Sequence, residues 1–597
     1  MKLSDYVFEF VASQGVKHVF LVPGGGAMHL NNSLGSRSDI TFVCTAHEQA
    51  SAIAAEAYAR VTNNLGVALV TTGPGGTNAV TGVDAAWLDS TPCLFISGQV
   101  KRADLKKDSG LRQLGVQETD IVSIVSSITK YAVTVTDPKT IRYHLERAVY
   151  EARSGRPGPV WIDIPLDVQA ADVDVSTLEG WTPPSAAVGN QTAVEEAVSK
   201  TLALLSGAQR PVILVGNGVR LAGAQEDFLR LADQLGMPVL TTRLGVDLIP
   251  ASHPLSFGMP GTIASRASNF CLQNSDFLLM LGARMDMALI AYAPERLARA
   301  AKKVMVNIDA AEIHKLGKAI DVAAALDARA FVRGLSARVG ELSKADRSAW
   351  LLRCRDWKAR YPFVTPKHSE SEGAVSVYAF SDALAGALEE GAVVLPGSAG
   401  NACEVFLTAF KAKAGQRIFH NKGTGAMGLS QPSAIGAALA SGRPTVCIDG
   451  DGGFALNVQE LQTIRRLGLP IVFFVMNNGG YASIRASQQG YFGRLTGADA
   501  KSGMTLPALD KLAAAYGLGF ARLCDMRNLR ADIERILALP RPLLCEVVVI
   551  PDEPRAPRVS SMQKPDGSMV SKPLEDMWPF LEREEFVANM IVKPLDE

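Results

Sequence analysis

The residues of this chain with the clearest chemical potential are Asp451 and Asn478, because each follows a short apolar run that has the texture of a buried strand. The run 444–448 precedes Asp451 and the run 470–476 precedes Asn478, with a helix-period stretch between the two runs. A strand, helix, strand crossover makes the two strands parallel and usually neighbours, so their carboxyl ends lie on the same edge of a sheet. The two side chains are therefore predicted to face one crevice.

A carboxylate and an amide oxygen suit a hard divalent cation. Mg²⁺ takes oxygen ligands in an octahedron and completes its shell with substrate phosphates and water. With the backbone carbonyl of Gly480 as a third ligand, Asp451 and Asn478 would leave room for a diphosphate. Backbone N–H groups can approach phosphate oxygens closely at the glycines of the turn predicted over 449–454, which are Gly450, Gly452 and Gly453. This segment predicts a metal-bridged diphosphate site, although the Gly-Asp-Gly triplet alone also fits an ordinary turn.

The composition describes a large globular protein with no strong overall charge. Its 597 residues are enough for three or four domains, and 47% of them are hydrophobic while 20% are charged. Lys plus Arg and Asp plus Glu number 60 each, so the formal net charge is zero and no global field favours nucleic acid or an anionic membrane. The apolar runs are far too short to cross a bilayer. We therefore expect no nucleic-acid partner and no membrane partner.

The cysteine pattern indicates a reducing compartment. The eight cysteines are scattered, without a Cys-x-x-Cys pair, and several lie inside apolar runs. Such a pattern fits reduced, buried thiols better than a disulfide framework or a zinc site. The N-terminus reads as the start of an amphipathic helix and has no cleavable apolar core. These features predict a cytoplasmic protein.

Strand-like apolar runs alternate with helical patterns almost from end to end. This texture predicts an α/β fold with doubly wound parallel sheets. Stretches rich in Pro and polar residues at 169–190 and 361–374 have the composition of linkers. The linkers predict three domains and a Pro-rich tail that should lie over another surface, with the boundaries 1–170, 191–345, 374–552 and 553–597.

Four motifs in this order resemble those of thiamine diphosphate enzymes. They are His47-Glu48-Gln49, the loop from Thr72 to Asn78, the run Gly423-Thr-Gly-Ala-Met-Gly428, and the span from Gly450 to Asn478. Over nearly its whole length the chain resembles the acetohydroxyacid synthase (acetolactate synthase) large subunit. The resemblance implies pyrimidine-binding, central and diphosphate-binding domains, with thiamine diphosphate and Mg²⁺ held between two chains of a homodimer or homotetramer.

In such enzymes an acid in the first domain activates the cofactor, and Glu48 stands at that position. Glu48 would hydrogen-bond N1′ of the aminopyrimidine and favour the imino tautomer, whose 4′-nitrogen removes the thiazolium C2 proton. The resemblance also assigns Thr72 and Asn78 to the cofactor site. Without the resemblance, Glu48 reads as an ordinary surface acid at a helix start, where the helix dipole favours negative charge.

In the third domain, Met427 would wedge under the folded cofactor beside Gly425. Gly400 and Asn401, at the end of the apolar run 393–395, lie where the family contacts the diphosphate. Alternative readings exist for each of them. A buried Met is often a flexible core filler, and turn chemistry explains Gly400 and Asn401 nearly as well.

The resemblance to this family also places two further polar residues at the mouth of the active site. His29 follows the loop Pro23-Gly-Gly-Gly26 and would move protons during carboligation. Gln117 occupies a position that reaches the site of the partner chain in the family. A hydrogen-bonded histidine without a catalytic role and a merely surface-exposed glutamine are the alternatives.

The central domain carries features of a nucleotide site. In acetohydroxyacid synthases the corresponding region binds FAD, which takes no net part in redox chemistry. Arg284 would pair with the FAD pyrophosphate, and Asp309, with Asp327 beyond it, would contact ribose and adenine. Relatives also exist whose central domain is empty or holds another nucleotide, so the resemblance leaves these alternatives open.

Two positions depart from the branched-chain biosynthetic enzymes and bear on the substrate. Ser487 stands where those enzymes carry Trp, and Val116 stands where they carry Phe. The loss of two rings enlarges the pocket, and Arg485 nearby could add a cation. We therefore expect an acceptor other than 2-ketobutyrate, for which a keto sugar is one roomier example.

The function predicted from the sequence is decarboxylation of a 2-keto acid, with pyruvate as the expected donor, followed by carboligation to a carbonyl acceptor. One alternative is a lyase or hydrolase that uses the same cofactor on a dione or a 2-hydroxyacyl substrate. A second alternative is a catalytically silent relative that binds the cofactor for assembly or regulation.

Overall fold

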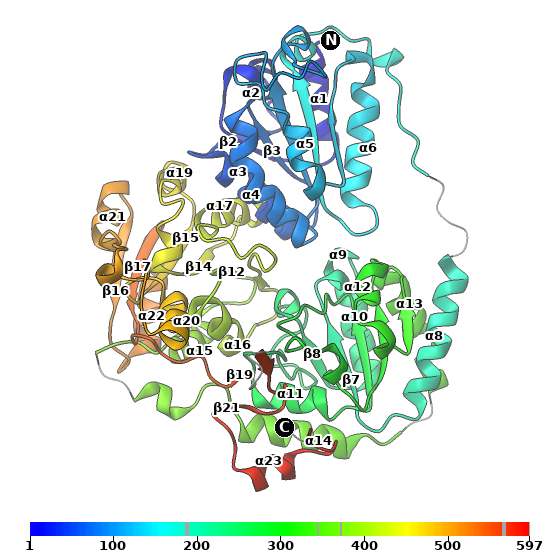
Figure 1. The fold of residues 1–597 in the computed structure, drawn as a ribbon, viewed down its shortest axis with the longest axis vertical. Helices are drawn as coiled ribbons and strands as arrows, with labels where there is room; N and C mark the ends of the chain where they lie inside the picture. Colours follow the sequence, from blue (N-terminus) through cyan, green and yellow to red (C-terminus); the bar gives the residue numbers. More distant parts are fainter. Residues whose placement is uncertain (185–189, 343–344, 371–372, 564–568, 596–597) are drawn as a thin grey trace.

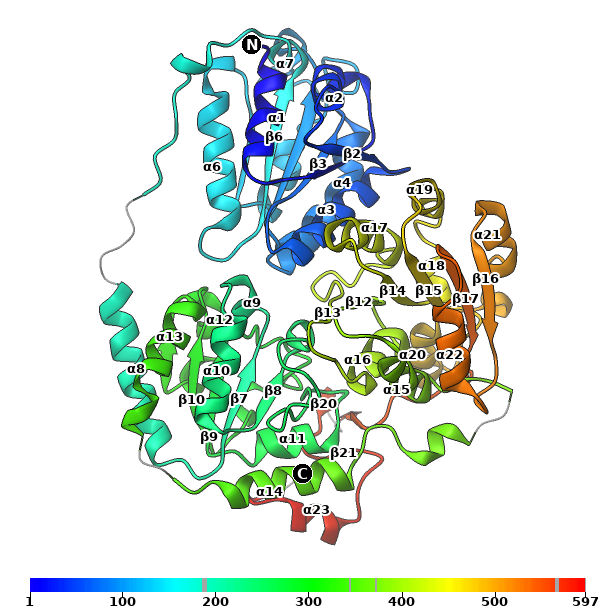
Figure 2. The same ribbon diagram turned by 180° about the vertical axis from the view of Figure 1, so that it is seen from behind.

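The computed structural model describes residues 1–184, 190–342, 345–370, 373–563 and 569–595. These residues form three α/β domains, each with helices packed around a parallel sheet (Figure 1, Figure 2). The tail after the third domain runs back over the central domain. The predicted fold class is confirmed.

The N-terminal domain has the strand order β2-β1-β3-β4-β6-β5, with parallel neighbours. Its central strands are buried along their whole length, which explains why they read as continuous apolar runs. The strands are His18–Leu21 (β1), Thr41–Cys44 (β2), Gly66–Val70 (β3), Cys93–Gln99 (β4), Tyr131–Thr134 (β5) and Pro159–Pro165 (β6). The helices are Leu3–Ser13 (α1), Met28–Gly35 (α2), Glu48–Thr62 (α3), Pro74–Leu88 (α4), Ile121–Val125 (α5), Ile141–Arg153 (α6) and Leu166–Gln169 (α7).

The central domain has the strand order β11-β10-β9-β7-β8. Its strands are Pro211–Val215 (β7), Val239–Thr241 (β8), Phe277–Leu281 (β9), Lys302–Val306 (β10) and Val322–Ala324 (β11). Its helices are Asn190–Ser206 (α8), Gly218–Leu221 (α9), Gln225–Leu235 (α10), Arg266–Gln273 (α11), Ala310–His314 (α12), Ala328–Arg338 (α13) and Ser348–Arg360 (α14).

The third domain has the strand order β13-β12-β14-β15-β17-β16. Its strands are Val393–Pro396 (β12), Arg417–Ile418 (β13), Thr445–Gly450 (β14), Ile471–Asn477 (β15), Gly519–Leu523 (β16) and Leu543–Val548 (β17). Its helices are Val377–Ala387 (α15), Phe406–Ala409 (α16), Ser430–Ser441 (α17), Asp451–Phe454 (α18), Glu460–Leu467 (α19), Ala482–Phe492 (α20), Leu509–Tyr516 (α21) and Leu529–Leu537 (α22).

The order of the third sheet creates a crevice at one edge. The chain passes from β12 outward to β13 and then returns to β14 on the other side of β12. Loops that leave β12 and β14 therefore diverge, and such a switch point is where open α/β sheets bind ligands. The segment predicted as a turn over 449–454 is in fact the single helical turn α18, in which Ala455 N donates to Asp451 O at 3.2 Å.

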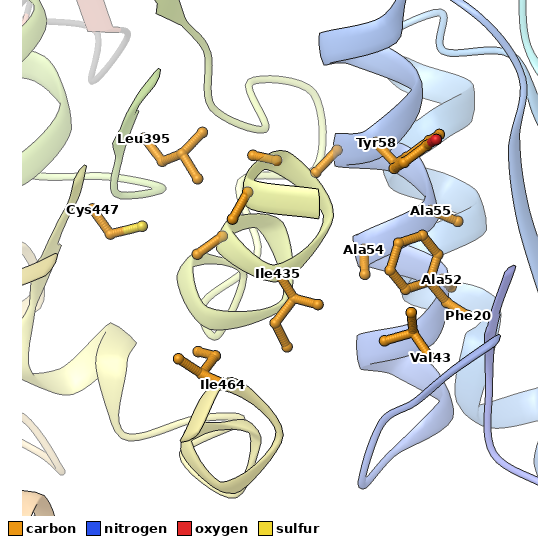
Figure 3. Packing of buried hydrophobic residues seen from close by; sticks show 14 of the residues in the cluster. Phe20, Val43, Ala52, Ala54, Ala55, Tyr58, Leu395, Ile435, Cys447 and Ile464 are labelled. Atoms are coloured by element: carbon orange, nitrogen blue, oxygen red, sulfur yellow. The ribbon is translucent and has the colours of Figure 1, made fainter. Parts of the chain in front are cut away.

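The first and third domains of one chain meet through α3 and α17 (Figure 3). Small residues let the two helices approach closely: a Cβ on Gly436 of α17 would lie only 2.0 Å from the carbonyl oxygen of Ala54 on α3. Glycine is therefore required at this crossing. Ile435 and Tyr58 extend the same buried cluster on either side of the contact.

The C-terminal tail joins the third domain to the central domain. Arg558 of the tail forms a β-bridge with Ile263 of the central domain. Further along, Arg266 donates to Met577 O at 3.0 Å. The tail elements are Arg558–Val559 (β18), Ser561–Gln563 (β19), Met569–Ser571 (β20), Met577–Trp578 (β21) and Arg583–Asn589 (α23).

The structure bears on two expectations drawn from the composition, which are reduced, buried cysteines and apolar runs too short to cross a bilayer. Each of the eight cysteines is free, and six of them are buried. In the part of the chain that the structure describes, no helix combines the length and the apolar character needed to cross a membrane.

Candidate active site

The strand ends of the third sheet bring Asp451 and Asn478 together. Strands β14 and β15 are parallel neighbours with Gly450 opposite Met476, so the residues that follow them leave the sheet side by side. Both Asp451 and Asn478 line one cavity of about 360 Å³ at this edge. The crevice predicted from the crossover is present.

The Asp451 carboxylate is buried and is held by backbone N–H groups. Its Oδ2 accepts hydrogen bonds from Gly479 N at 2.8 Å and from Gly480 N at 3.0 Å. Burial raises the pKa of Asp451, and the backbone N–H groups around it oppose that rise. A divalent cation in the cavity would further favour the ionised carboxylate.

The amide oxygen of Asn478 has the environment expected of a metal ligand. Asn478 Oδ1 is buried without a hydrogen-bond partner among the described residues. A buried acceptor that lacks a partner is costly, and a cation would satisfy it. The Asn478 backbone is fixed because Arg485 Nη2 donates to its carbonyl oxygen at 3.0 Å.

The third predicted ligand, the Gly480 carbonyl, lies in the same loop. This carbonyl accepts from Ala482 N at 3.1 Å, which leaves its second lone pair for another partner. Glycine is needed at this position because φ is +132° and a Cβ would lie 2.5 Å from Ala498 O. The described residues hold no cluster of three or more His, Cys, Asp or Glu side chains that could bind a metal, so carbonyl and amide oxygens would have to complete this ligand set.

Bare backbone borders the cavity where a diphosphate was predicted. A Cβ on Gly452 would lie 2.4 Å from the ring of Tyr481, and a Cβ on Gly453 would lie 2.8 Å from Asp449 Oδ1. Gly450 lines the same cavity. Burial raises the pKa of Asp449 to about 6, against the hydrogen bond from the Ser430 hydroxyl.

Gly400, Asn401 and Met427, which the resemblance assigns to the cofactor, also line this cavity. Gly400 has φ +68°, and Asn401 donates through Nδ2 to Glu553 O of the tail at 3.0 Å. Met427 is 40% exposed, which is unusual for a core filler. Gly425, two residues before it, has φ +61°.

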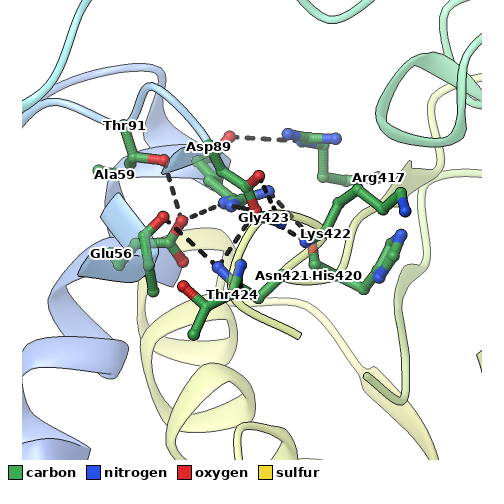
Figure 4. A network of polar contacts seen from close by, with 12 residues as sticks. Glu56, Ala59, Asp89, Thr91, Arg417, His420, Asn421, Lys422, Gly423 and Thr424 are labelled. Carbon is green, nitrogen blue, oxygen red and sulfur yellow. Dashed lines mark hydrogen bonds and ion pairs between the residues drawn. The ribbon is translucent and has the colours of Figure 1, made fainter. Parts of the chain in front are cut away.

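The loop that carries Met427 is anchored on the first domain of the same chain (Figure 4). The buried carboxylate of Asp89 accepts from Lys422 N at 2.8 Å and from Gly423 N at 2.9 Å. Arg60 Nη2 donates to the same carboxylate at 2.7 Å. Sequence reasoning missed Asp89, because no local motif marks a contact between residues more than 300 positions apart.

In the first domain, Glu48 begins α3 and is buried, so it is not the exposed helix-start acid of the alternative reading. Asn78 Nδ2 donates to Glu48 Oε2 at 2.9 Å. The other oxygen of the Glu48 carboxylate remains for a further hydrogen-bond donor. Helices α3 and α4 thus bring together two of the predicted cofactor residues.

Thr72 lies at the centre of a buried polar chain. Its hydroxyl contacts Gln99 Oε1 at 3.0 Å and Gln117 O at 3.2 Å. Gln99 Nε2 in turn donates to Asp163 Oδ2 at 3.2 Å. Burial raises the pKa of Asp163 to about 7, against hydrogen bonds from Ser97, Gln99 and Thr134.

The loop before His29 packs beside this chain. A Cβ on Gly26 would lie 2.6 Å from the Thr72 side chain, so the loop backbone touches Thr72 directly. His29 is half-buried at the start of α2. Gln117 is exposed with φ +65°. The structure therefore groups the loop before His29 with Thr72 and Gln117.

The two groups of predicted residues lie apart within one chain. The residues that line the cavity of Asp451 all fall between 377 and 558, so none comes from the first domain. Glu48 and its neighbours form a first-domain half-site, and Asp451 and its neighbours form a third-domain half-site. One chain alone does not bring the two half-sites into a common cavity.

A second cavity, of about 400 Å³, lies between the first and central domains. Arg284 and Asp327 line it together with the bare backbone of Gly218 and Gly282. Asn217 Oδ1, also in the lining residue set, is buried without a partner within the described ranges. This chemistry fits a nucleotide.

Arg284 and Asp309 both have protein partners, and Asp309 is not among the residues that line this cavity. Arg284 Nη1 donates to Leu88 O at 3.2 Å, and Asp309 pairs with Arg156 at 2.9 Å while it caps α12. Arg156 lines the cavity from the first domain and also pairs with Glu312 at 2.9 Å. Sequence reasoning missed Arg156 because it lies outside every motif and in another domain.

Ser487 and Val116, the two positions that bear on the expected acceptor, do not line the cavity of Asp451. Ser487 lies on the exposed side of α20, where its hydroxyl donates to Ser483 O at 3.1 Å. Val116 is 87% exposed. Arg485 is directed to the Asn478 carbonyl and to Asp552, at 3.0 Å, instead of adding a free cation to the cavity.

Comparisons with known proteins agree with this geometry. Residues 1–124, 198–335 and 398–547 match the thiamine pyrophosphate enzyme N-terminal TPP binding domain, central domain and C-terminal TPP binding domain, respectively. The chain is 31% identical to a probable acetolactate synthase large subunit of Methanocaldococcus jannaschii, over 93% of each chain. It is 33% identical to the chloroplastic acetolactate synthase 2 of Nicotiana tabacum, over 94% of this chain and 84% of that one. It is 30% identical to the acetolactate synthase large subunit of Lactococcus lactis, over 93% of this chain and 94% of that one.

The substitution Asp89→Asn is expected to destabilise the joint between the first and third domains. It removes the charge that Arg60 pairs with and turns an amide N–H₂ toward backbone donors. Breaking a buried ion pair costs about 3 kcal/mol. We expect a lower midpoint of thermal unfolding, measured by circular dichroism.

The matched control is Asp39→Asn, which breaks the exposed ion pair with Arg37. Exposed pairs contribute little to stability, so this variant should unfold close to the native midpoint. Equal midpoints for the two variants would contradict the anchoring role of Asp89.

Proposed function

This chain belongs to the thiamine pyrophosphate enzyme family, and we propose that it is an acetolactate synthase-like carboligase. It decarboxylates a 2-keto acid, with pyruvate as the proposed donor, and joins the resulting acyl unit to a carbonyl acceptor. Its cofactors are thiamine diphosphate and Mg²⁺. The observation that carries the assignment is that Asn478 Oδ1, which has no hydrogen-bond partner among the described residues, shares one cavity with Asp451 at neighbouring strand ends.

The third-domain half-site would hold the metal and the diphosphate. Asp451, Asn478 and the Gly480 carbonyl are the proposed metal ligands, since they offer three oxygens in one loop cluster. The backbone along α18 and at Gly400 would approach the phosphate oxygens, because side chains are absent there. Asn401 would support the same group from the end of β12.

The first-domain half-site would hold the aminopyrimidine. Thiamine diphosphate, when bound, supplies a carbon nucleophile and an electron sink. Glu48 would hold a proton at the pyrimidine N1′ through its free oxygen, while Asn78 fixes the other oxygen at 2.9 Å. Burial of Glu48 strengthens this contact, because water does not compete for the carboxylate.

Met427 would set the shape of the bound cofactor. Its side chain reaches into the cavity from a loop that Asp89 and Asn421 hold rigid: Asn421 Oδ1 accepts from Gly425 N at 3.0 Å. A fixed apolar side chain can force the two rings together without contributing a polar contact. Gly425 permits the loop to turn through φ +61°.

His29 and Gln117 would act on the substrate. Both belong to the first-domain half-site, beside Thr72, and neither is deeply buried. His29 would transfer protons during carboligation, since an imidazole titrates near neutral pH. Gln117 would orient the substrate by hydrogen bonds at the mouth of the site.

A complete site would require two copies of this chain. Since Glu48 and Asp451 do not share a cavity in one chain, we propose that the first domain of a partner copy closes over the cavity of Asp451. The exposed side chains of Met427 and Val116 would then be covered. The assembly would be a homodimer or a homotetramer, and the free buried thiols support a cytoplasmic location.

The cavity between the first and central domains is the proposed FAD site. Arg284 would contact the pyrophosphate, and Asp327 would contact the ribose or adenine end. Arg156 adds a second cation at this cavity, next to Asp309. The unpartnered Asn217 Oδ1 would accept a hydrogen bond from the bound nucleotide.

The proposed acceptor follows from two side chains that are smaller than those of the branched-chain biosynthetic enzymes. Ser487 and Val116 replace two aromatic rings with small side chains, which supports an acceptor roomier than 2-ketobutyrate, such as a keto sugar. A lyase acting on a dione and a silent relative are not favoured, because the full-length relatives are acetolactate synthases and each proposed catalytic group is present.

The purified protein with thiamine diphosphate, Mg²⁺ and pyruvate is expected to release CO₂ and to form a ligation product. Mass spectrometry of products across a panel of carbonyl acceptors would identify the preferred acceptor. Absence of CO₂ release from every 2-keto acid tested would refute the decarboxylase assignment.

Glu48→Gln should abolish cofactor activation while the fold persists. The amide no longer holds a proton as the carboxylate does, so exchange of the cofactor C2 proton, followed by NMR, should slow by about 10²- to 10⁴-fold. Glu9→Gln, on the exposed face of α1, is the control and should exchange at the native rate. Native exchange in Glu48→Gln would overturn this role.

Asp451→Ala should weaken Mg²⁺-dependent retention of thiamine diphosphate. Because the carboxylate is a proposed ligand, the Mg²⁺ concentration for half-maximal cofactor binding should rise about tenfold or more in calorimetric titrations. Asp552→Asn is the matched control, since this carboxylate borders the same cavity but is 61% exposed and pairs with Arg485. Similar Mg²⁺ requirements in both variants would argue against the assigned ligand.

A further inference from the structure

A third cleft lies where the three domains meet, and it shares no lining residue with the two cavities described above. Its volume is about 470 Å³, and its walls come from α3 of the first domain, α9, α10 and α13 of the central domain, and β13 of the third domain. Arginines dominate its lining, and they are Arg60, Arg220, Arg230, Arg329, Arg333 and Arg417.

The rim of this cleft carries three arginines that share one acid. Arg333 Nε lies 2.8 Å from Asp227 Oδ2, Arg329 Nε lies 3.8 Å from the same oxygen, and Arg230 pairs with Asp227 Oδ1. The three side chains are about half exposed or more, at 57%, 48% and 64%. A single carboxylate cannot neutralise three guanidinium groups.

The floor repeats this arrangement with buried groups. Arg220 and Arg417 share the buried carboxylate of Asp247, at 2.8 Å and 2.9 Å. Arg220 Nε is buried without a hydrogen-bond partner in the described chain. The pKa of Arg417 is lowered to about 10, chiefly by burial; Asp247 opposes this shift, and Arg220 and Arg60 contribute to it. Positive charge on the floor is therefore incompletely compensated.

Counting the charges gives an excess of positive charge. Arg60 is neutralised separately by Glu56 and Asp89. The five other arginines face three acids, which are Asp227, Asp247 and Glu226. With Arg60 and its two acids included, six arginines face five acids, so the cleft retains an excess of one positive charge, although the whole chain has a formal net charge of zero.

The rim arginines do not serve to hold the domains together. Arg230, Arg329 and Arg333 belong to α10 and α13, and their ion pairs are with Asp227 of α10, within the same domain. The ion pair that links two domains lies at the floor, where Arg417 of the third domain pairs with Asp247 of the central domain. The charge at the rim is thus left available to a ligand.

We propose that this cleft binds a phosphate-bearing anion. The planar guanidinium groups of Arg329 and Arg333 would form paired hydrogen bonds with phosphoryl oxygens at the rim, and Arg220 would contact the anion from below. A phosphoryl anion would compensate the excess positive charge of the cleft. Since the walls come from three domains, the bound anion would also connect them. This inference concerns residues outside the proposed catalytic site and does not depend on the proposed reaction.

The test is calorimetric titration of inorganic phosphate into the protein saturated with thiamine diphosphate and Mg²⁺, at low ionic strength. Saturation occupies the diphosphate cavity, so phosphate binding there does not contribute. We expect saturable binding that the double variant Arg329→Gln, Arg333→Gln weakens about tenfold or more. Phosphate should also raise the thermal unfolding midpoint of the native chain more than that of the variant.

Arg338→Gln is the matched control, because Arg338 lies on the same helix but pairs with Glu341 outside the cleft. This variant should bind phosphate like the native chain. Both variants should keep the far-ultraviolet circular dichroism spectrum of the native chain, which verifies their fold. Native phosphate affinity in the double variant, or no saturable binding to the native chain, would overturn the proposal.

Discussion

The third domain depends on one buried carboxylate that ties two strand ends together. Asp451 leaves β14 and accepts the backbone N–H groups of Gly479 and Gly480, which leave β15. A buried carboxylate without such donors would be strongly unfavourable. The other carboxylate oxygen, Oδ1, accepts from Gly452 N at 2.8 Å, and Asp451 lines the cavity together with Asn478. The same pair of backbone hydrogen bonds thus fixes the loop and orients both proposed metal ligands.

A second constraint separates the two halves of the site. Helices α3 and α17 pack so closely at Gly436 that the first and third domains cannot slide past each other without a steric clash. Glu48, on α3, is therefore held away from the cavity of Asp451 in its own chain. This separation is the reason for the proposal that a second copy completes the site. The proposed assembly would also cover the exposed side chain of Met427.

The sequence predicted those parts of the site that depend on local order along the chain. Asp451 and Asn478 were found because a strand, helix, strand crossover places residues by spacing alone. Asp89 and Arg156 were missed, because each acts on a different domain and no neighbouring residue marks that contact. The orientation of Arg485 was also beyond the sequence, since it depends on the carbonyls that its side chain meets. The sequence predicted a turn over 449–454, where the structure has the single helical turn α18. The backbone conformation there depends on close packing around Gly452 and Gly453, which the sequence does not show.

Arg60 connects the two features that the sequence did not reveal. Its guanidinium lines the arginine cleft, and it donates to Asp89, which holds the N–H groups of Lys422 and Gly423. The loop that carries Met427 begins at these residues. An anion in the cleft would attract Arg60 and so compete with Asp89 for the same guanidinium. Charge in the cleft and the position of Met427 are therefore linked through Arg60 and Asp89. The ion pair between these two residues is buried, so water and salt screen it little.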